Sequence, residues 1–270
     1  MLALAGCEGT FSNDLATDAP ADPAVTQVQV ALLGVEFETA DGSTHELKFT
    51  DPETVDLLDL ADTPLRMFTT EQLPADQYTG VRLLFDDQVD TTVVNSTSGE
   101  FPLVLQAGSF ATVDFTVTDN RRSQDDVTVA LDLRQSLSFD DADQQYTLKP
   151  ALRAVSTSDS AQISGTVTAT CPTGSSLSQG GAVYLYAGAD VTPDDLDAID
   201  AEPYATTRVV GTTGGSSFTY ALRFLAPGRY TLALTCEGDV DQLGASDDLG
   251  FQDVQNVRVD SGETLTIDLD

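Results

Sequence analysis

The chain has 270 residues, of which 41% are hydrophobic, and this is enough to fill two cores of ordinary size. Acidic residues outnumber basic ones by 44 to 12, which gives a formal net charge of -32. Such a charge repels phosphates, so it excludes nucleic acid and anionic lipid head groups as direct partners. Two interpretations of the excess of acidic residues stay open: a solvated surface suited to salty surroundings, or aspartates that bind divalent cations.

The N-terminal sequence Leu4-Ala5-Gly6-Cys7 resembles the lipobox of bacterial lipoproteins. The resemblance implies cleavage before Cys7 and acylation of that residue. A secretory signal places a charged segment and an apolar core of about 7 to 15 residues before the box. Only three residues precede it here, so this interpretation expects a start further upstream. The alternative is a cysteine that lies near an apolar start by chance.

Residues 1–24 are predicted to form the lipobox and a disordered tether, because Glu8 to Ala24 is acidic, contains prolines and lacks apolar periodicity. Such a tether would hold the first domain roughly 20 to 25 Å from the membrane. By resemblance to lipoprotein sorting, Glu8 after the cysteine implies the outer membrane. The predicted location is therefore the bacterial cell envelope, with a lipid anchor at Cys7 as the contact with the membrane.

Residues 25–156 alternate apolar and polar side chains and predict a β-sandwich. Val25 to Glu38 is a strand with a bulge at Gly34, and Asp41-Gly42 is a hairpin turn. Pro150 indicates an edge or a bulge. The further predicted strands are residues 45–49, 55–60, 65–69, 81–85, 101–105, 110–117, 127–139 and 146–155.

A loop-to-strand corner occurs twice, as LPADQYTGVRLLFD from Leu73 and as LAPGRYTLAL from Leu225. In each copy a leucine leads into a proline-containing turn, and a Tyr-Thr pair opens an apolar strand. The duplication favours two related sandwiches in series. Tyr78 and Tyr230 are predicted to be structural, each donating a hydrogen bond back to its loop.

Four motifs together resemble a bacterial lipoprotein domain of unknown function, family 4382. They are TVDLLDL from Thr54, the corner at Leu73, VALDLRQSLSF from Val129 and YTLKPALRAV from Tyr146. The resemblance covers residues 25–156. It implies a β-sandwich and a cell-envelope location, and it supplies no catalytic residue.

Residues 161–270 follow a short polar linker and resemble a transthyretin-like or carboxypeptidase-regulatory-like domain. The motifs that carry this are Ile163 to Val167, the run from Gly180 to Tyr186, the second corner and the C-terminal VRVDSGETLTIDLD. The predicted fold class is thus all-β, with two immunoglobulin-like sandwiches after the tether. Thr192 to Leu196 has the cap, proline and acids of a helix start, which predicts one or two helical turns.

Cys171 and Cys236 each end a strand-like run, and an exported location favours a disulfide between them. The alternative is two buried free thiols. Metal binding through these sulfurs is disfavoured, because there are only two and the sole histidine, His45, is distant in sequence.

No catalytic residue is predicted. His45 is the only histidine, and the sequence holds no nucleophile elbow, phosphate loop, dinucleotide fingerprint or zinc spacing. Arg82, Arg134 and Arg153 are expected to pair with carboxylates at sheet surfaces.

Calcium is the one ligand with candidate residues, namely aspartates on loops. Asp194, Asp195 and Asp197 are the named candidates, and none of the acidic clusters has the pattern of a known calcium loop. The other clusters are Asp86-Asp87-Asp90, Asp140-Asp141-Asp143, and Asp239 and Asp241 with Asp247 and Asp248.

The function that these features favour is a non-enzymatic cell-envelope lipoprotein whose sandwiches bind a surface partner, either protein or glycan. The alternative is a calcium-dependent adhesion or carbohydrate-binding module. A hydrolase is the third and least favoured class, because with 44 acids some carboxylate pair always falls at a suitable distance.

Overall fold

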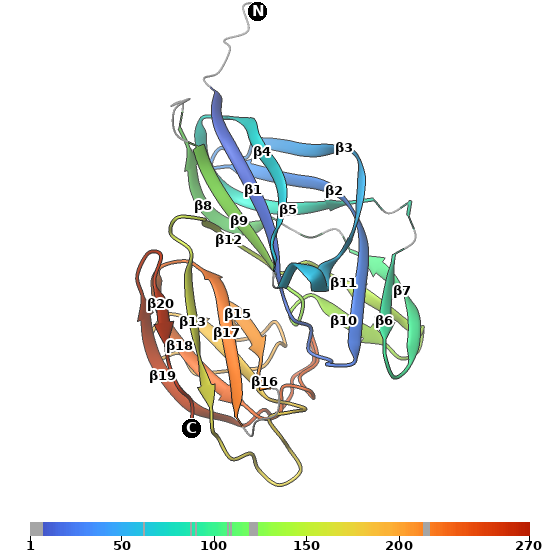
Figure 1. The fold of residues 1–270 in the computed structure, drawn as a ribbon, viewed down its shortest axis with the longest axis vertical. Coiled ribbons are helices and arrows are strands. Elements are labelled where there is room, and N and C mark those ends of the chain that lie inside the picture. The colour runs from blue at the N-terminus through green and yellow to red at the C-terminus, as the bar shows by residue number, and fades with distance from the viewer. Residues whose placement is uncertain are drawn as a thin grey trace, which may run out of the picture.

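A computed structural model of the chain describes residues 8–61, 63–86, 88–89, 91–106, 108, 110–118, 124–212 and 217–270. These residues form an all-β protein of two sandwiches, seen one above the other in Figure 1. This confirms the predicted all-β class with two sandwiches. Cys7, the predicted lipidation site, lies outside the described residues. No helix in the described parts of the chain has the length and apolarity needed to cross a membrane.

The first sandwich packs a four-stranded sheet on an eight-stranded one. The smaller sheet has the order β12 (Leu152–Ser156), β9 (Gln124–Asp132), β1 (Glu8–Asp18) and β4 (Leu65–Pro74). The larger has the order β10 (Leu137–Asp140), β11 (Gln145–Leu148), β7 (Gly99–Leu105), β6 (Thr92–Asn95), β2 (Val25–Thr39), β5 (Asp76–Phe85) and β8 (Ala111–Val117), with β3 (Thr44–Asp56) also paired to β2. One core joins the two sheets, and Phe11 of β1 contacts the rings of Phe37 and Phe115 there.

The tether predicted for Glu8 to Ala24 is wrong, because β1 is an inner strand of the smaller sheet. It pairs antiparallel with β4 and parallel with β9, and Phe11 and Leu15 are fully buried. Its polar residues find buried partners: the Asn13 amide donates to the Val127 carbonyl at 3.1 Å, and the Thr17 hydroxyl donates to the Leu57 carbonyl at 2.6 Å. The first domain therefore begins at β1 and not at Val25.

The predicted bulge in β2 is confirmed, since the register of β2 with both β3 and β5 shifts between Leu32 and Gly34. Gly34 has a φ of 150°, and a Cβ there would lie 2.0 Å from the Leu47 carbonyl oxygen. Only glycine fits that approach. The Asp41-Gly42 turn is also confirmed and joins β2 to β3.

Two predicted strands have other structures. Leu57 and Leu60, expected within a strand, belong to the 3-10 helix η1 (Leu57–Ala61) and point into the core. The strand expected from Val127 to Phe139 is divided into β9 and β10, because Asp132 caps a turn by accepting a hydrogen bond from the Gln135 amide at 3.2 Å.

The second sandwich packs two four-stranded sheets around one core. One sheet has the order β16 (Val210–Gly211), β17 (Phe218–Leu225), β13 (Ala161–Val167) and β20 (Thr264–Thr266), and the other has the order β15 (Ala205–Arg208), β14 (Ala182–Ala187), β18 (Gly228–Thr235) and β19 (Phe251–Val259). The outer face of the latter sheet is also apolar. There Tyr184 and Tyr186 are buried with Leu249 and Phe251 packed against them.

Both corners have the predicted tyrosine hydrogen bond. Tyr78 donates to the Pro74 carbonyl at 2.8 Å, and Tyr230 donates to the Ala226 carbonyl at 2.6 Å. In each case the acceptor lies four residues before the tyrosine, so the same corner is built twice. Burial raises the pKa of both hydroxyls, which keeps them protonated as donors.

Candidate functional site

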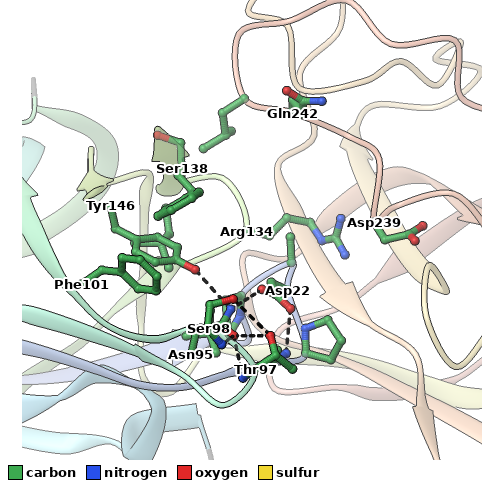
Figure 2. A pocket seen from close by; sticks show the side chains of 18 of the residues that line it. Asp22, Asn95, Thr97, Ser98, Phe101, Arg134, Ser138, Tyr146, Asp239 and Gln242 are labelled. Atoms are coloured by element: carbon green, nitrogen blue, oxygen red, sulfur yellow. Dashed lines mark hydrogen bonds between the residues drawn. The ribbon is translucent and has the colours of Figure 1, made fainter. Parts of the chain in front are cut away.

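A cavity of about 840 Å³ lies where one end of the first sandwich meets loops of the second. In Figure 2, Phe101 and Tyr146 stand on one side, and Asp239 and Gln242 of the second sandwich stand on the other. Residues from both sandwiches line it. They include residues 20–25, Asn95, Thr97, Ser98, Phe101, Arg134, Leu137, Ser138, Phe139, Asp141, Gln144, Tyr146, Gln179, Asp239, Asp241, Gln242 and Leu243.

One wall of the cavity is aromatic. Phe101 of β7, Phe139 of β10 and Tyr146 of β11 form a cluster with ring centroids 4.7 to 5.9 Å apart. Phe139 is 38% exposed, although most large apolar side chains of the chain are buried. Since exposed aromatic rings are common where a ligand packs, this wall is a candidate contact surface.

The floor of the cavity is a polar network around Asn95, at the end of β6. The Asn95 side-chain amide donates to Asp22 at 2.7 Å, and the Thr97 hydroxyl donates to the side-chain oxygen Oδ1 of Asn95 at 2.7 Å (Figure 2). The Tyr146 hydroxyl lies 3.4 Å from the same amide. Burial raises the pKa of Tyr146. Its hydroxyl therefore stays protonated and able to donate.

Arg134 stands between the two domains and was wrongly expected to pair with a carboxylate at a sheet surface. It is 2% exposed and donates to the Gly238 carbonyl at 2.5 Å, and its guanidinium carbon lies 5.7 Å from the Tyr184 ring. No ion pair involves it within the described residues. The pairing with a carboxylate expected for Arg82 and Arg153 is found, with Glu36 at 2.5 Å and Asp18 at 2.6 Å, but the pair of Arg153 is buried and does not lie at a sheet surface.

The pairing of Arg153 is also a contact between the domains. Besides Asp18, the guanidinium donates to the carbonyl oxygens of Arg223 at 2.8 Å and Phe224 at 3.3 Å, both in the second sandwich. Asp132 likewise accepts hydrogen bonds from the amide and hydroxyl of Thr206. Buried polar contacts thus join the two sandwiches.

The three calcium candidates lie close together in the loop between β14 and β15. One carboxylate oxygen each of Asp194, Asp195 and Asp197 lies within 4.8 Å of the others. A second triad of the same spacing joins Asp195 to Asp241 and Asp247 of the loop between β18 and β19. Among the other predicted clusters, Asp140, Asp141 and Asp143 form an exposed turn, while Asp87 and Asp90 lie outside the described residues.

The helix predicted from Thr192 is absent, and residues 192–197 form a loop. Its backbone groups are bound by side chains instead of by one another. The Tyr186 hydroxyl contacts both the amide and the carbonyl of Asp194, and the Leu196 amide donates to Asp241 at 3.1 Å. Tertiary contacts therefore replace the hydrogen bonds of a first helical turn.

The disulfide between Cys171 and Cys236 is confirmed, with a Cα–Cα distance of 5.7 Å. Cys171 lies in the loop after β13, and Cys236 directly follows β18. The bond holds that loop beside the start of the segment that carries Asp239, Asp241 and Asp247.

The family described as a domain of unknown function (DUF4382) matches residues 8–150, which is more than half of the chain. The chain belongs to this family. The match begins with β1, in agreement with the role of that strand in the first sandwich. It includes the aromatic wall and the Asn95 network, whereas the opposite wall lies in the second sandwich and beyond the DUF4382 match.

No curated protein matches the sequence of this DUF4382 chain. Among solved structures, the Bacillus anthracis TIE protein is 10% identical over 97% of this chain with a TM-score of 0.23, and this chain spans 34% of its length. A putative cell adhesion protein from Bacteroides fragilis is 10% identical over 96% of this chain and 92% of its own, with a TM-score of 0.21. These TM-scores are too low to indicate a shared function.

The sequence contained few signals for the cavity. The run Asn95-Ser96-Thr97-Ser98-Gly99 is a recognisable turn, and the Asn95 side chain does accept hydrogen bonds from the amides of Thr97 and Ser98. Nothing local to it indicates that Asp22 and Tyr146 converge there. These residues meet only because β2, β6, β7 and β11 are neighbours in one sheet.

Proposed function

We propose that the protein is a non-enzymatic cell-envelope lipoprotein that binds a neutral glycan in the cavity between its two sandwiches. The observation that carries the proposal is the combination of an aromatic wall with a surrounding set of amide, hydroxyl and carboxylate groups. Sugar rings present C–H groups on their faces and hydroxyl groups at their edges. The C–H groups pack on aromatic rings. The hydroxyl groups donate hydrogen bonds to carboxylates and accept them from amides.

The charge of the protein supports a neutral ligand. Asp22, Asp141, Asp239 and Asp241 line the cavity, and Arg134 is the one basic residue among the described lining residues. Its guanidinium already donates to Gly238. An anionic glycan would meet net negative charge here, whereas a neutral one uses the carboxylates as acceptors.

Binding is tested on a glycan array of neutral oligosaccharides and then by calorimetry with the best binder. We expect Phe139→Ala to raise the Kd by about tenfold or more, because the variant removes the exposed ring of the aromatic wall. Val254→Ala is the matched control, since Val254 is 48% exposed on β19 and does not line the cavity. Its Kd should equal that of the wild type.

Two results would refute this assignment. One is the absence of binding to any neutral glycan on the array. The other is equal affinity in the Phe139 variant, which would place binding outside the cavity. A binding protein also returns its ligand unchanged, so the eluted oligosaccharide should keep its mass; release of shorter products would instead indicate a hydrolase.

The lipid anchor is the second part of the proposal and rests on the lipobox resemblance at Cys7. Because β1 begins at Glu8, an acylated Cys7 would hold the first sandwich directly at the membrane surface with no spacer. The cavity is lined by residues 20–25, which follow the end of β1 that is distant from Cys7, and by loops of the second sandwich.

Acyl labelling tests the anchor in cells that express the full-length precursor or its Cys7→Ser variant. We expect labelled palmitate in the wild-type protein and its loss in the variant, with the wild-type protein in the outer-membrane fraction. Equal labelling of the two proteins would contradict the anchor and, with it, the proposed location.

A further inference from the structure

The outer face of the sheet β15-β14-β18-β19 is covered by two acidic loops. Residues 188–204 join β14 to β15, and residues 236–250 join β18 to β19. Apolar contacts fix both loops on the sheet, through Val191 and Ala201 in the first and Leu249 in the second. Asp195 comes from the first loop, and Asp241 and Asp247 come from the second. The packed loops therefore hold carboxylates from two distant segments side by side.

The spacing of these three carboxylates suits one calcium ion. Calcium binds oxygen at about 2.3 to 2.6 Å, so two ligands on opposite sides of the ion lie about 4.6 to 5.2 Å apart, and adjacent ones lie closer. One oxygen from each of Asp195, Asp241 and Asp247 lies within 4.8 Å of the others. All three can thus contact a single ion.

Asp195 supplies an observation that does not depend on the acidic composition. The residue is only 2% exposed, and its Oδ1 is buried without a hydrogen-bond partner, while Oδ2 accepts from the Asp247 amide. A buried carboxylate oxygen without a partner is costly, and such groups in folded proteins are normally hydrogen-bonded or bound to a cation. The cation nearest to this group among the described residues is the Arg134 guanidinium, which donates to the Tyr184 hydroxyl at 3.3 Å, and its single charge faces three carboxylates.

The other two carboxylates are held in place by neutral donors. Asp241 accepts from the Leu196 amide and from the Tyr184 hydroxyl, and Asp247 accepts from the Gln242 amide at 2.8 Å. Each of these oxygens keeps a lone pair for a metal. These donors are neutral and orient the carboxylates without cancelling their charge. Because the three acids outnumber the one guanidinium near them, the arrangement remains attractive to a cation.

The acidic residues at the exposed turn after Asp140 differ from this triad. There the acids are solvated, and Asp140 accepts hydrogen bonds from the Ala142 amide at 2.8 Å and the Asp143 amide at 3.3 Å. That cluster has the composition of a cation site but no buried oxygen without a partner among the described residues.

We propose that Asp195, Asp241 and Asp247 bind one Ca²⁺ that links the two loops, with Asp194 and Asp197 at its rim. Calcium suits the site better than Mg²⁺, because loop carboxylates and carbonyls give flexible coordination, whereas Mg²⁺ requires a near-ideal octahedron. The ion would also fix the loop on which Asp241 and Gln242 face the cavity. The site itself stands independently of glycan binding.

Terbium luminescence on the full chain is the direct test. The protein has no tryptophan, and Tyr184 bonds to Asp241 itself, so excitation of tyrosine should sensitise a Tb³⁺ ion bound there. We expect saturable emission that Ca²⁺ displaces, with a calcium Kd on the order of 10⁻⁵ to 10⁻³ M, and at least tenfold weaker displacement by Mg²⁺. Absence of saturable emission, or equal displacement by the two ions, would overturn the proposal.

Three variants locate the site. Asp195→Asn and Asp247→Asn should each weaken calcium binding at least tenfold, whereas Asp248→Asn should leave it within twofold of wild type. Asp248 is the matched control, because it is exposed on the same loop, carries the same charge and belongs to neither triad. Equal losses in all three variants would indicate diffuse attraction by the acidic surface and would refute a defined site.

Thermal melting separates lost binding from lost folding. Removing one charge relieves repulsion within the cluster, so calcium-free Asp195→Asn should melt no lower than calcium-free wild type. Saturating calcium should raise the melting temperature of the wild type by about 5 °C or more and leave that of Asp195→Asn nearly unchanged. An equal rise in both proteins would place the stabilising ion elsewhere. Glycan binding is measured separately, at saturating calcium. A failure of the calcium site can then be distinguished from a failure of glycan binding in the cavity.

Discussion

Arg153→Met is expected to destabilise the folded chain by about 3 to 5 kcal/mol, because it leaves a buried carboxylate without its partner. Arg153 is 4% exposed and Asp18 is 7% exposed, and their charged groups lie 2.6 Å apart. The methionine keeps most of the apolar length of the side chain. What it removes is the charge and the hydrogen bonds to the carbonyl oxygens of Arg223 and Phe224. Urea unfolding at pH 7.5 measures the loss.

The pH dependence of this loss identifies its electrostatic part. Burial raises the pKa of Asp18 to about 6 even though Arg153 opposes the rise. A folded-state pKa above the unfolded value of about 3.9 means that the folded state gains stability as pH falls through that window. Without Arg153 the pKa of Asp18 rises further. The difference in unfolding free energy between the variant and the wild type should therefore be smaller at pH 5 than at pH 7.5.

Two controls make the result specific. Arg258→Met removes an exposed ion pair with Asp260 and should change stability by less than about 1 kcal/mol. Asp18→Asn combined with Arg153→Met removes the uncompensated charge and should recover part of the stability lost in the single variant. A loss of the same size at both pH values, with no recovery in the double variant, would show that packing alone explains the effect.

Removal of the disulfide should cost the second sandwich about 4 kcal/mol. Cys171 and Cys236 are 65 residues apart. In the chain-entropy model, a cross-link of this span lowers the conformational entropy of the unfolded chain and thereby destabilises it by that free energy. Alanine is the better replacement at both positions, because Cys236 is fully buried and a serine hydroxyl would need a new partner there. Thermal and urea unfolding of Cys171→Ala/Cys236→Ala against wild type give the difference.

A reducing agent supplies the internal control for the disulfide. Reduced wild type should approach the stability of the double variant, while the variant itself should not respond. If the variant lost less than about 1 kcal/mol, or if reduction left the wild type unchanged, the cross-link would not stabilise the fold.

Much of the strand content could be predicted from local sequence. The alternation in Val25 to Glu38, the turn at Asp41-Gly42 and the bulge at Gly34 each depend on a few neighbouring residues, and the structure has all three. The two corner tyrosines were predictable for the same reason, since donor and acceptor lie four residues apart. The pairing of the two cysteines followed from their small number and the expected compartment.

Errors occurred where distant partners override local preference. Glu8 to Asp18 has the composition of a flexible segment, yet β9 and β4 supply its backbone hydrogen bonds, and Asn13 and Thr17 find buried acceptors. Thr192 to Leu196 has the signals of a helix start, yet Tyr186 and Asp241 bind its backbone. In both places the fold supplies hydrogen bonds that no window of neighbouring residues contains.

The candidate sites divide in the same way. The sequence by itself determined the all-β class, the duplicated corner and the acidic character of the segment at Asp194, because periodicity, turn residues and composition are local properties. Only the tertiary structure placed Asp241 and Asp247 beside Asp195 and closed a cavity between the sandwiches. The physical reason is that these arrangements depend on which strands are neighbours and on buried polar contacts across the domain interface, such as those of Arg134 and Arg153.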